Sequence, residues 1–392
     1  MSTIDLISNV LKPNLQVNHG FVVSRPGSEV ADFHHKLPGY HHTAVHDLPA
    51  IAEKVGVAQV IVKDESTRLE LPSFKMLGAS WASFNALADH TGIDREGWNT
   101  LEELAERLRP FGPLTLAAAT DGNHGRAVAR MASLLGLNAV IYVPDDMAAA
   151  RIKAIESEGA DVIVVDGYYD DAIAMSAAAA SVDTLVVSDT SWEGYEDIPR
   201  RVIEGYSTIF DEVDTQLDTA ASHVFIPLGV GALGAATVAH FHDAVPRPQI
   251  IGVEPLEAAC VQEALEVGEV VTIESQFRTS MVGLNCGTAS RIAYPALAAG
   301  LDWTVAISDQ WSDEAMRLYA DNSLVSGESG AACLGGLLAI NDSKAHEEVG
   351  LDSSSIVLLI ITESATDPEN YLRVVGDLPA TSDSTLPLGA LG

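Results

Sequence analysis

The chain has 392 residues, of which 47% are hydrophobic, and its 22 basic and 55 acidic residues leave a net charge of −33. This length predicts two domains with a substantial core, and the negative charge argues against nucleic-acid binding because phosphates would be repelled. No apolar run approaches the roughly 18 residues of a membrane span, and the start lacks the pattern of a secretory signal. We therefore expect a cytoplasmic protein without a membrane segment.

The acidic residues are dispersed through hydrophobic, periodic sequence instead of forming one acidic tail. The folded surface itself is therefore expected to be acidic. Lysine is scarce, and such a surface suits a protein that works at high salt, where screening weakens the repulsion between like charges. The composition predicts a halophilic protein.

Cysteines and histidines are the residues to inspect for a metal site. Three widely separated cysteines predict reduced core thiols, not a disulfide framework or a zinc site. Five histidines crowd one N-terminal segment but lack a paired pattern such as HExxH, so we predict no metal site there. The residues are Cys260, Cys286 and Cys333, and His34, His35, His41, His42 and His46.

Short runs of β-branched residues recur along the chain, and most are continuous instead of alternating. Continuous apolar runs are typical of parallel strands buried on both faces, and the stretches between them have helical composition. The pattern predicts an α/β protein of two domains, with mostly parallel twisted sheets flanked by helices. The predicted strands are 59–63, 114–120, 138–144, 161–167, 184–190, 223–229, 249–255 and 356–364.

Ligands bind at the carboxyl ends of strands in such sheets, so the loops there are candidate sites. In ELPSFKMLGAS, Lys75 lies between Phe74 and Met76. Apolar neighbours are expected to lower the pKa of this lysine and favour the neutral amine that attacks an aldehyde. The alternative is a surface lysine whose stem covers apolar groups.

Three further loops carry unusual sequence. TDGNHGRAVAR, from Thr120, offers glycines and a helix start for an anion, or an ordinary capped turn. PLGVGALGAATVAH has the spacing of a phosphate-binding glycine loop, and it equally permits a dinucleotide site, although Glu254 fits the ribose-binding position only loosely. In IITESATDPENY, Thr362 could present its hydroxyl to a ligand or cap a turn.

Together these four loops resemble the pyridoxal-phosphate (PLP) enzymes of the tryptophan-synthase-β type (fold type II), which include serine and threonine dehydratases and cysteine synthase. The resemblance spans nearly the whole chain. Within this group, FHHKLPGYHHT, VKDES with PSFKMLG, DTSWEGYEDIP and ITESATDPENY are more similar to the diaminopropionate ammonia-lyases. Asp121 adds to this resemblance, because the diaminopropionate ammonia-lyases have aspartate before GNH, whereas the dehydratases usually have serine or threonine there.

The resemblance implies PLP as the cofactor and a role for each matching residue. Lys75 would hold PLP as a Schiff base, Asn123 would contact its phenolic oxygen, and Thr362 would face the pyridine nitrogen. Asp121 and Asp189 would be the acidic residues of the substrate pocket, and Glu328 would support the cofactor ring. The phosphate cradle would be Gly229, Val230, Gly231, Ala232, Leu233 and Gly234. This chain departs from the pattern at Val230, Ala232 and Ser364, where related enzymes have glycines.

The resemblance further implies α,β-elimination of 2,3-diaminopropionate to pyruvate and ammonia by a homodimer that takes a small amino acid as substrate. Lys75 and Asp121 would be bases for opposite substrate configurations. The expected domains are a large PLP-binding domain of residues 1–85 and 190–392 and a smaller nested domain of residues 86–189. Two alternatives remain open: a serine/threonine dehydratase or β-replacing synthase, and a dinucleotide-binding or ligand-sensing protein.

Overall fold

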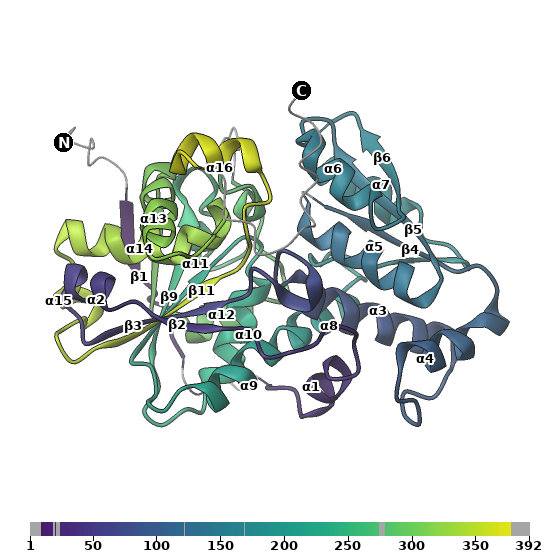
Figure 1. Ribbon diagram of the computed structural model, residues 1–392, viewed down its shortest axis with the longest axis horizontal. Coiled ribbons are helices and arrows are strands. Elements are labelled where there is room, and N and C mark those ends of the chain that lie inside the picture. Colours follow the sequence, from purple (N-terminus) through teal and green to yellow (C-terminus); the bar gives the residue numbers. More distant parts are fainter. Residues whose placement is uncertain are drawn as a thin grey trace.

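The computed structural model describes residues 9–18, 20, 24–120, 122–167, 169–273 and 279–377. Asp121, one of the predicted pocket residues, lies outside the described residues. Strands and helices alternate along the described chain and form two separate sheets with helices packed against them (Figure 1). The α/β class predicted from the sequence is confirmed.

The larger sheet has seven strands in the order β1-β10-β9-β8-β11-β3-β2. Its five central strands are parallel, and the two edge strands, β1 and β2, are antiparallel to their neighbours. The central strands therefore end at one common edge. The strands are β1 (Asn9–Pro13), β2 (Val45–Asp47), β3 (Gln59–Asp64), β8 (His223–Pro227), β9 (Gln249–Pro255), β10 (Trp303–Ile307) and β11 (Ile356–Ile361).

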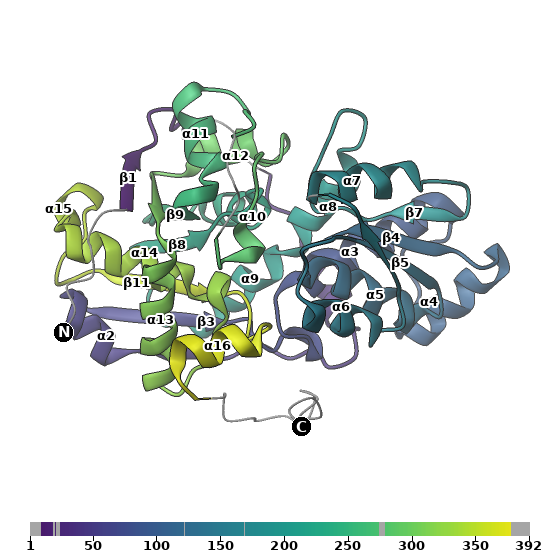
Figure 2. The same cartoon turned by 90° about the horizontal axis from the view of Figure 1, so that it is seen from above.

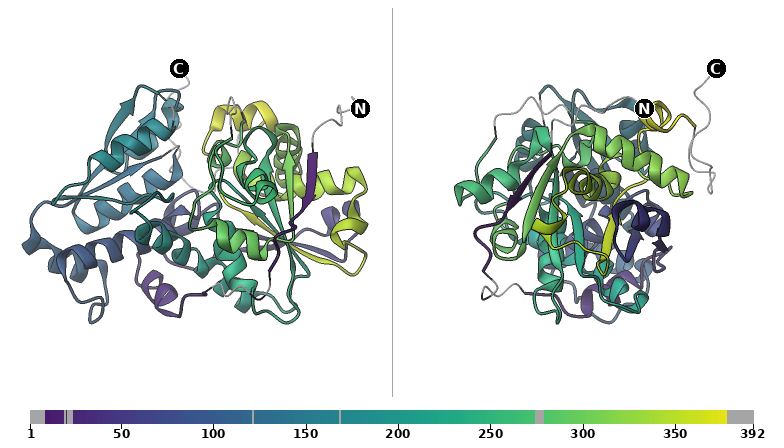
Figure 3. Two further views of the ribbon diagram at one scale, coloured as in Figure 1. Left: turned by 180° about the vertical axis from the view of Figure 1, so that it is seen from behind. Right: turned by 90° about the vertical axis from the view of Figure 1, so that its left-hand side faces the viewer.

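The smaller sheet has four parallel strands in the order β6-β5-β4-β7. All four come from one continuous stretch of chain between two parts of the larger sheet: β4 (Thr115–Ala119), β5 (Asn138–Pro144), β6 (Asp161–Val165) and β7 (Thr184–Val186). In Figures 1 and 2 this sheet lies beside the larger one, and the same arrangement is visible from behind (Figure 3).

The eight predicted strands all form, whereas β1, β2 and β10 were missed. Residues 10–13 of β1 and all three residues of β2 are only partly buried or exposed, so neither strand has the continuous apolar run that indicates burial on both faces. The strand β6 shows the opposite effect: its sequence, DVIVV, is strongly apolar, but as an edge strand it leaves Ile163 and Val164 exposed.

The helices pack on both sheets. α3 contacts α5 and α8, α5 packs on β4 and β5, and α14 lies against β8 and β11. The helices are α1 (Glu29–His34), α2 (Pro49–Val55), α3 (Lys75–Thr91), α4 (Leu101–Leu108), α5 (Asn123–Leu135), α6 (Ala149–Glu156), α7 (Tyr169–Ala178), α8 (Asp197–Gly205), α9 (Ser207–Gln216), α10 (Ala232–Phe241), α11 (Cys260–Val267), α12 (Tyr294–Gly300), α13 (Asp309–Asp321), α14 (Glu328–Ser343), α15 (His346–Val349) and α16 (Pro368–Val375). Of the helices described, none combines the length and the hydropathy needed to cross a bilayer.

A buried network of charges fixes the chain between β3 and α3. Arg68 donates to Glu65 and to Glu212, and Lys63 donates to Glu212 at 2.6 Å. All four side chains are at most 2% exposed, and their two positive and two negative charges balance. Because an unpaired buried charge is very costly, this network holds the segment that leads to the start of α3 in one place.

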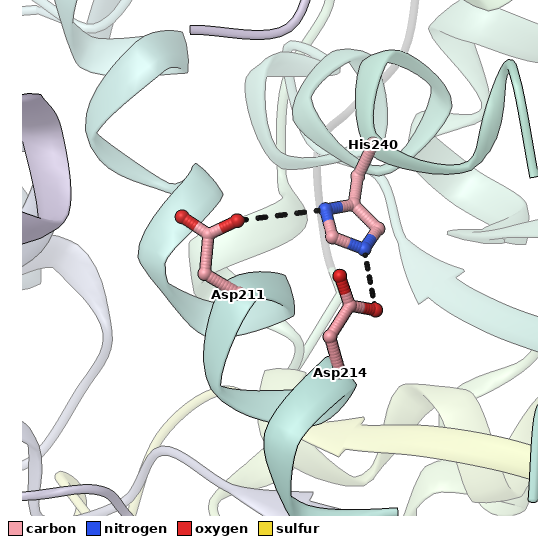
Figure 4. A group of neighbouring side chains, drawn as sticks. All are labelled: Asp211, Asp214 and His240. Carbon is pink, nitrogen blue, oxygen red and sulfur yellow. Dashed lines mark hydrogen bonds and ion pairs between the residues drawn. The ribbon is translucent and has the colours of Figure 1, made fainter. Parts of the chain in front are cut away.

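A second cluster ties the N-terminal segment to two helices. Asp211 and Asp214 on α9 flank opposite nitrogens of the His240 ring on α10 (Figure 4). Arg25 donates to Asp211 at 2.5 Å and lies 3.3 Å from Asp214. The three ligand-type side chains are close together, and Arg25 forms an ion pair with each carboxylate, so the cluster acts as an electrostatic anchor for the segment before α1.

Candidate active site

Lys75 is the first residue of α3, which precedes the smaller sheet in the chain. Its side chain contacts a carboxylate that follows β7, the last strand of that sheet in the chain. The Lys75 Nζ donates a hydrogen bond of 2.8 Å to Asp189 Oδ2. Phe74 contributes the apolar contact expected from the sequence, with its ring centre 5.5 Å from Nζ. The lysine is thus not a surface residue over apolar groups: it is an ammonium group with a buried anionic partner.

Asp189 follows β7 and is 6% exposed. Burial alone would raise the pKa of this carboxyl, but the positive charge and hydrogen bond of Lys75, together with the nearby His124, hold the pKa well below its usual range. The other carboxylate oxygen, Oδ1, accepts a hydrogen bond of 3.4 Å from the Tyr169 hydroxyl. Asp189 is therefore ionised at neutral pH and suited to bind a cation.

His124 lies in the first turn of α5, behind the Asp189 carboxylate. Its Nε2 is 2.8 Å from the carbonyl oxygen of Val187, and its Nδ1 is 3.9 Å from Asp189 Oδ2. Burial lowers the pKa of His124 below its ordinary value, against the attraction of Asp189. The sequence placed His124 in an unusual loop without assigning it a role, and the GNH motif beside the predicted cofactor contact was the available signal.

The glycine loop joins β8 to α10. Gly231 has φ of +93°, and a Cβ there would lie 2.5 Å from a methyl carbon of Leu297. A Cβ at Gly234 would meet a methyl carbon of Leu228, also at 2.5 Å. These positions require glycine, and the first turn of α10 leaves backbone N–H groups without helical acceptors, which is the arrangement that binds a phosphate.

Thr362 follows β11, whose strand neighbours are β8 and β3. Because these strands are parallel, Thr362 emerges at the same edge of the sheet as the glycine loop. The Thr362 carbonyl accepts a hydrogen bond of 3.2 Å from the Phe74 N–H, and the Ser364 N–H donates to Pro72 at 2.9 Å. The end of β11 is thereby attached to the turn that carries Lys75.

Asn123 begins α5, and its side-chain amide donates to Glu363, the residue after Thr362. The other Glu363 oxygen accepts a hydrogen bond of 3.3 Å from the Ser329 N–H at the start of α14. Glu363 was not among the predicted site residues, although it adjoins one. It connects α5, a helix that packs on the smaller sheet, to the end of β11 in the larger sheet.

Glu328, the first residue of α14, is 2% exposed. Asn370 donates to Glu328 Oε1, while Oε2 has no hydrogen-bond partner in the described part of the chain. Burial, and then the negative charge of Glu363, raise the pKa of Glu328 to about 7. The carboxyl is therefore partly protonated at neutral pH. Asn370 was also missed, since nothing local connects it to Glu328.

These groups fit PLP. A lysine can hold the aldehyde carbon, a glycine loop at a helix start can bind a phosphate, and a neutral hydroxyl at a strand end can face a pyridine nitrogen. The cradle cannot be filled by protein side chains, because added Cβ atoms at Gly231 and Gly234 would collide with leucines. Glu328 Oε2, which has no hydrogen-bond partner among the described residues, is a further polar atom that a bound group can contact. Fold and donor set together define the class of PLP-binding α/β enzymes.

The chain belongs to the pyridoxal-phosphate dependent enzyme family, whose model matches residues 36–363. It is 36% identical over 359 residues to diaminopropionate ammonia-lyase of Escherichia coli (strain K12), covering 88% of this chain and 89% of that protein. It is 26% identical over 334 residues to the biosynthetic L-threonine dehydratase of Corynebacterium glutamicum, covering 83% and 68%. Family membership confirms the predicted cofactor and argues against the dinucleotide-binding alternative.

Solved structures agree. The Escherichia coli diaminopropionate ammonia-lyase in complex with an aminoacrylate-PLP azomethine reaction intermediate has a TM-score of 0.85 and 33% sequence identity to this chain, covering 94% of this chain and 97% of that chain. The same enzyme in complex with D-serine has a TM-score of 0.86 with the same identity and coverage. The likeness therefore extends over both sheets.

Proposed function

We propose that this protein eliminates ammonia from 2,3-diaminopropionate in a PLP-dependent reaction that yields pyruvate and ammonia. The observation that carries the proposal is the buried, ionised Asp189 carboxylate in contact with a primary ammonium group, that of Lys75. A substrate with a second ammonium group matches such a site, whereas serine or threonine brings only a hydroxyl. The similarity to diaminopropionate ammonia-lyase supports the same substrate.

Each residue of the site has a proposed task. The backbone N–H groups of residues 229–234 bind the cofactor phosphate, Asn123 donates to its phenolic oxygen, Thr362 faces its ring nitrogen and Glu328 supports its ring. PLP, when bound, supplies an electron sink that makes the substrate's α-proton acidic. Lys75 Nζ accepts this proton on one face of the substrate, and Asp121 is proposed as the base for the opposite configuration. Asp189 orients the departing amino group.

The finer features of the protein are also proposed. The nested position of the smaller sheet in the chain supports a division into residues 1–85 with 190–392 and residues 86–189. Three buried, free cysteines suit a reducing, cytoplasmic environment, and the net charge of −33 suits high salt. We infer a homodimer from the family resemblance alone, and light scattering at molar salt tests it.

Pyruvate formation from the D and L isomers of diaminopropionate and serine tests the activity. We expect the wild type to use diaminopropionate at least about tenfold better, since charge attraction in a partly buried site contributes more than about 1.4 kcal/mol. Asp121→Ser is expected to lose the D isomer and keep part of the activity on the L isomer, whose proton Lys75 reaches. Equal turnover of serine by the wild type would instead indicate a dehydratase.

A further inference from the structure

Asp189 Oδ2 lies between two nitrogen atoms. Lys75 Nζ is 2.8 Å away and His124 Nδ1 is 3.9 Å away. The lysine nitrogen is the group that the cofactor takes when it is bound. The histidine nitrogen stays in place, and His124 is 2% exposed. Once the cofactor is bound to Lys75 Nζ, the protonation state of His124 therefore determines which chemical group can bind beside Asp189.

The hydrogen bond of His124 to Val187 determines which ring nitrogen carries the proton. A backbone carbonyl only accepts hydrogen bonds, so Nε2 must be the N–H nitrogen. In the neutral ring, Nδ1 then carries a lone pair. Burial favours this neutral form, and Nδ1 has no hydrogen-bond partner among the residues that the structure describes. A buried acceptor therefore faces a buried carboxylate.

Two buried acceptors side by side are unfavourable unless a donor lies between them. A primary ammonium group is the donor that fits, because it offers three N–H groups and a positive charge. Lys75 already shows that a primary ammonium reaches Asp189 Oδ2 at hydrogen-bonding distance. Among the described residues, the charged or titratable groups around His124 and Asp189 are Lys75 and the hydroxyls of Tyr169, Tyr195 and Tyr206.

We propose that His124 and Asp189 together form the subsite for the second amino group of a diamino acid, with His124 as a specificity-determining positioning residue. This inference rests on the proposed function and deepens it. The ammonium donates one N–H to His124 Nδ1 and another to Asp189. When the bond between the β-carbon and this nitrogen breaks, its electron pair stays on nitrogen and ammonia leaves, so His124 neither gains nor loses a proton.

His124→Gln tests the roles of the two ring nitrogens separately. The glutamine amide reaches as far as Nε2 and can keep the bond to Val187, but it places no acceptor at the position of Nδ1. His124→Asn is the matched control, because its amide lies near the position of Nδ1 and loses the reach to Val187. Both variants are made in a Lys75→Ala background loaded with PLP, in which Lys75 no longer occupies Asp189.

The measurement is a spectrophotometric titration with 2,3-diaminopropionate and with alanine, which has the same α-carbon groups and no second amine. We expect His124→Gln to weaken diaminopropionate binding about 10- to 100-fold, the range for a hydrogen bond to a charged group. Alanine binding should change less than about threefold. His124→Asn should retain most of the preference for diaminopropionate. Equal weakening of both ligands by His124→Gln, or no weakening of either, overturns the proposal.

If His124→Gln does not fold, a pH series on the wild-type holoenzyme tests the proposal instead. Protonated His124 repels an ammonium, so the KM for diaminopropionate should rise as the pH falls through the depressed pKa of His124, while the KM for serine stays level. A flat KM for diaminopropionate overturns the proposal. Failure of the proposed function gives a different result. The wild type then does not turn over diaminopropionate, but the preference for binding diaminopropionate over alanine in the Lys75→Ala background is unchanged.

Discussion

The Asn123 side-chain amide donates a hydrogen bond to Glu363, 240 residues further along the chain. A carboxylate can only accept, so the NH2 group of Asn123 must face Glu363, and its second N–H is left for another acceptor. Because Glu363 also accepts from the start of α14, it fixes the side chain of Asn123, the residue that we propose as the donor to the phenolic oxygen of the cofactor.

Glu363→Gln should therefore loosen the cofactor. Glutamine can donate as well as accept, so the Asn123 amide can rotate and present its carbonyl to the phenolic oxygen. We expect PLP affinity to fall about tenfold or more, as for loss of a charge-assisted hydrogen bond, with a shift of the visible absorption band. Glu369→Gln, which removes the same charge at an exposed position, is the control. Identical affinity and spectrum in both variants would contradict this role of Glu363.

Lys75→Ala should abolish the visible band of the lysine-bound cofactor and the elimination activity. Unlike a lysine in a loop, Lys75 starts α3 and pairs with Asp189, so its loss leaves a buried carboxylate without its cation. We expect about 2 kcal/mol of destabilisation, measured by denaturant unfolding. Lys75→Arg keeps the cation and should regain most of the stability but no activity. A linkage that borohydride still traps in either variant would refute the assignment of Lys75.

Gly231→Val should sharply weaken PLP binding, because a side chain is strained at φ of +93° and its Cβ would lie 2.5 Å from Leu297. Gly268 provides a matched control. It lies at the end of α11 with φ of +92°, and a Cβ there would make only an ordinary contact of 3.9 Å with Gln16 Nε2. Gly268→Val should lower the melting temperature through the same backbone strain and leave PLP affinity unchanged. Weaker PLP binding in both variants would show that strain alone is responsible.

Glu328 should make the stability of the cofactor-free protein depend on pH. Its pKa is about 7 in the folded state against 4.5 for an ordinary glutamate, so its contribution to stability is fully present below about pH 4.5 and is lost as the pH rises through 7. The difference is on the order of 3 kcal/mol. Glu328→Gln should remove this dependence, so that the wild type loses stability relative to the variant as the pH rises from about 4.5 to about 7, with no further loss above that. Parallel pH curves for the two proteins would exclude a raised pKa.

The net charge of −33 should make folding depend on salt. The screening length is about 3 Å at 1 M salt and about 10 Å at 0.1 M, so dilution strengthens repulsion across the acidic surface. We expect the melting temperature and the activity to fall together on dilution from molar salt. Unchanged values in about 0.1 M salt would refute the halophilic interpretation and leave the catalytic proposal intact.

The sequence by itself determined the features that depend on residues close together in the chain. Continuous apolar runs identified the parallel strands because strands buried on both faces need no polar alternation. Glycines at 229, 231 and 234 identified a tight strand-to-helix loop, and Lys75 stood out between apolar neighbours. Position in an α/β sheet then predicted that the loops after β8 and β11 open on the same edge.

Only the tertiary structure decided which distant residues meet. Lys75 and Asp189 are 114 residues apart, and no local pattern shows that one neutralises the other, that His124 faces both, or that Glu363 orients Asn123. Such contacts arise from the packing of α3 against α5 and of α5 against β4 and β5, which depends on the whole set of side chains between them. Local periodicity reports which face of an element is buried, whereas the partner that covers that face is a property of the complete fold.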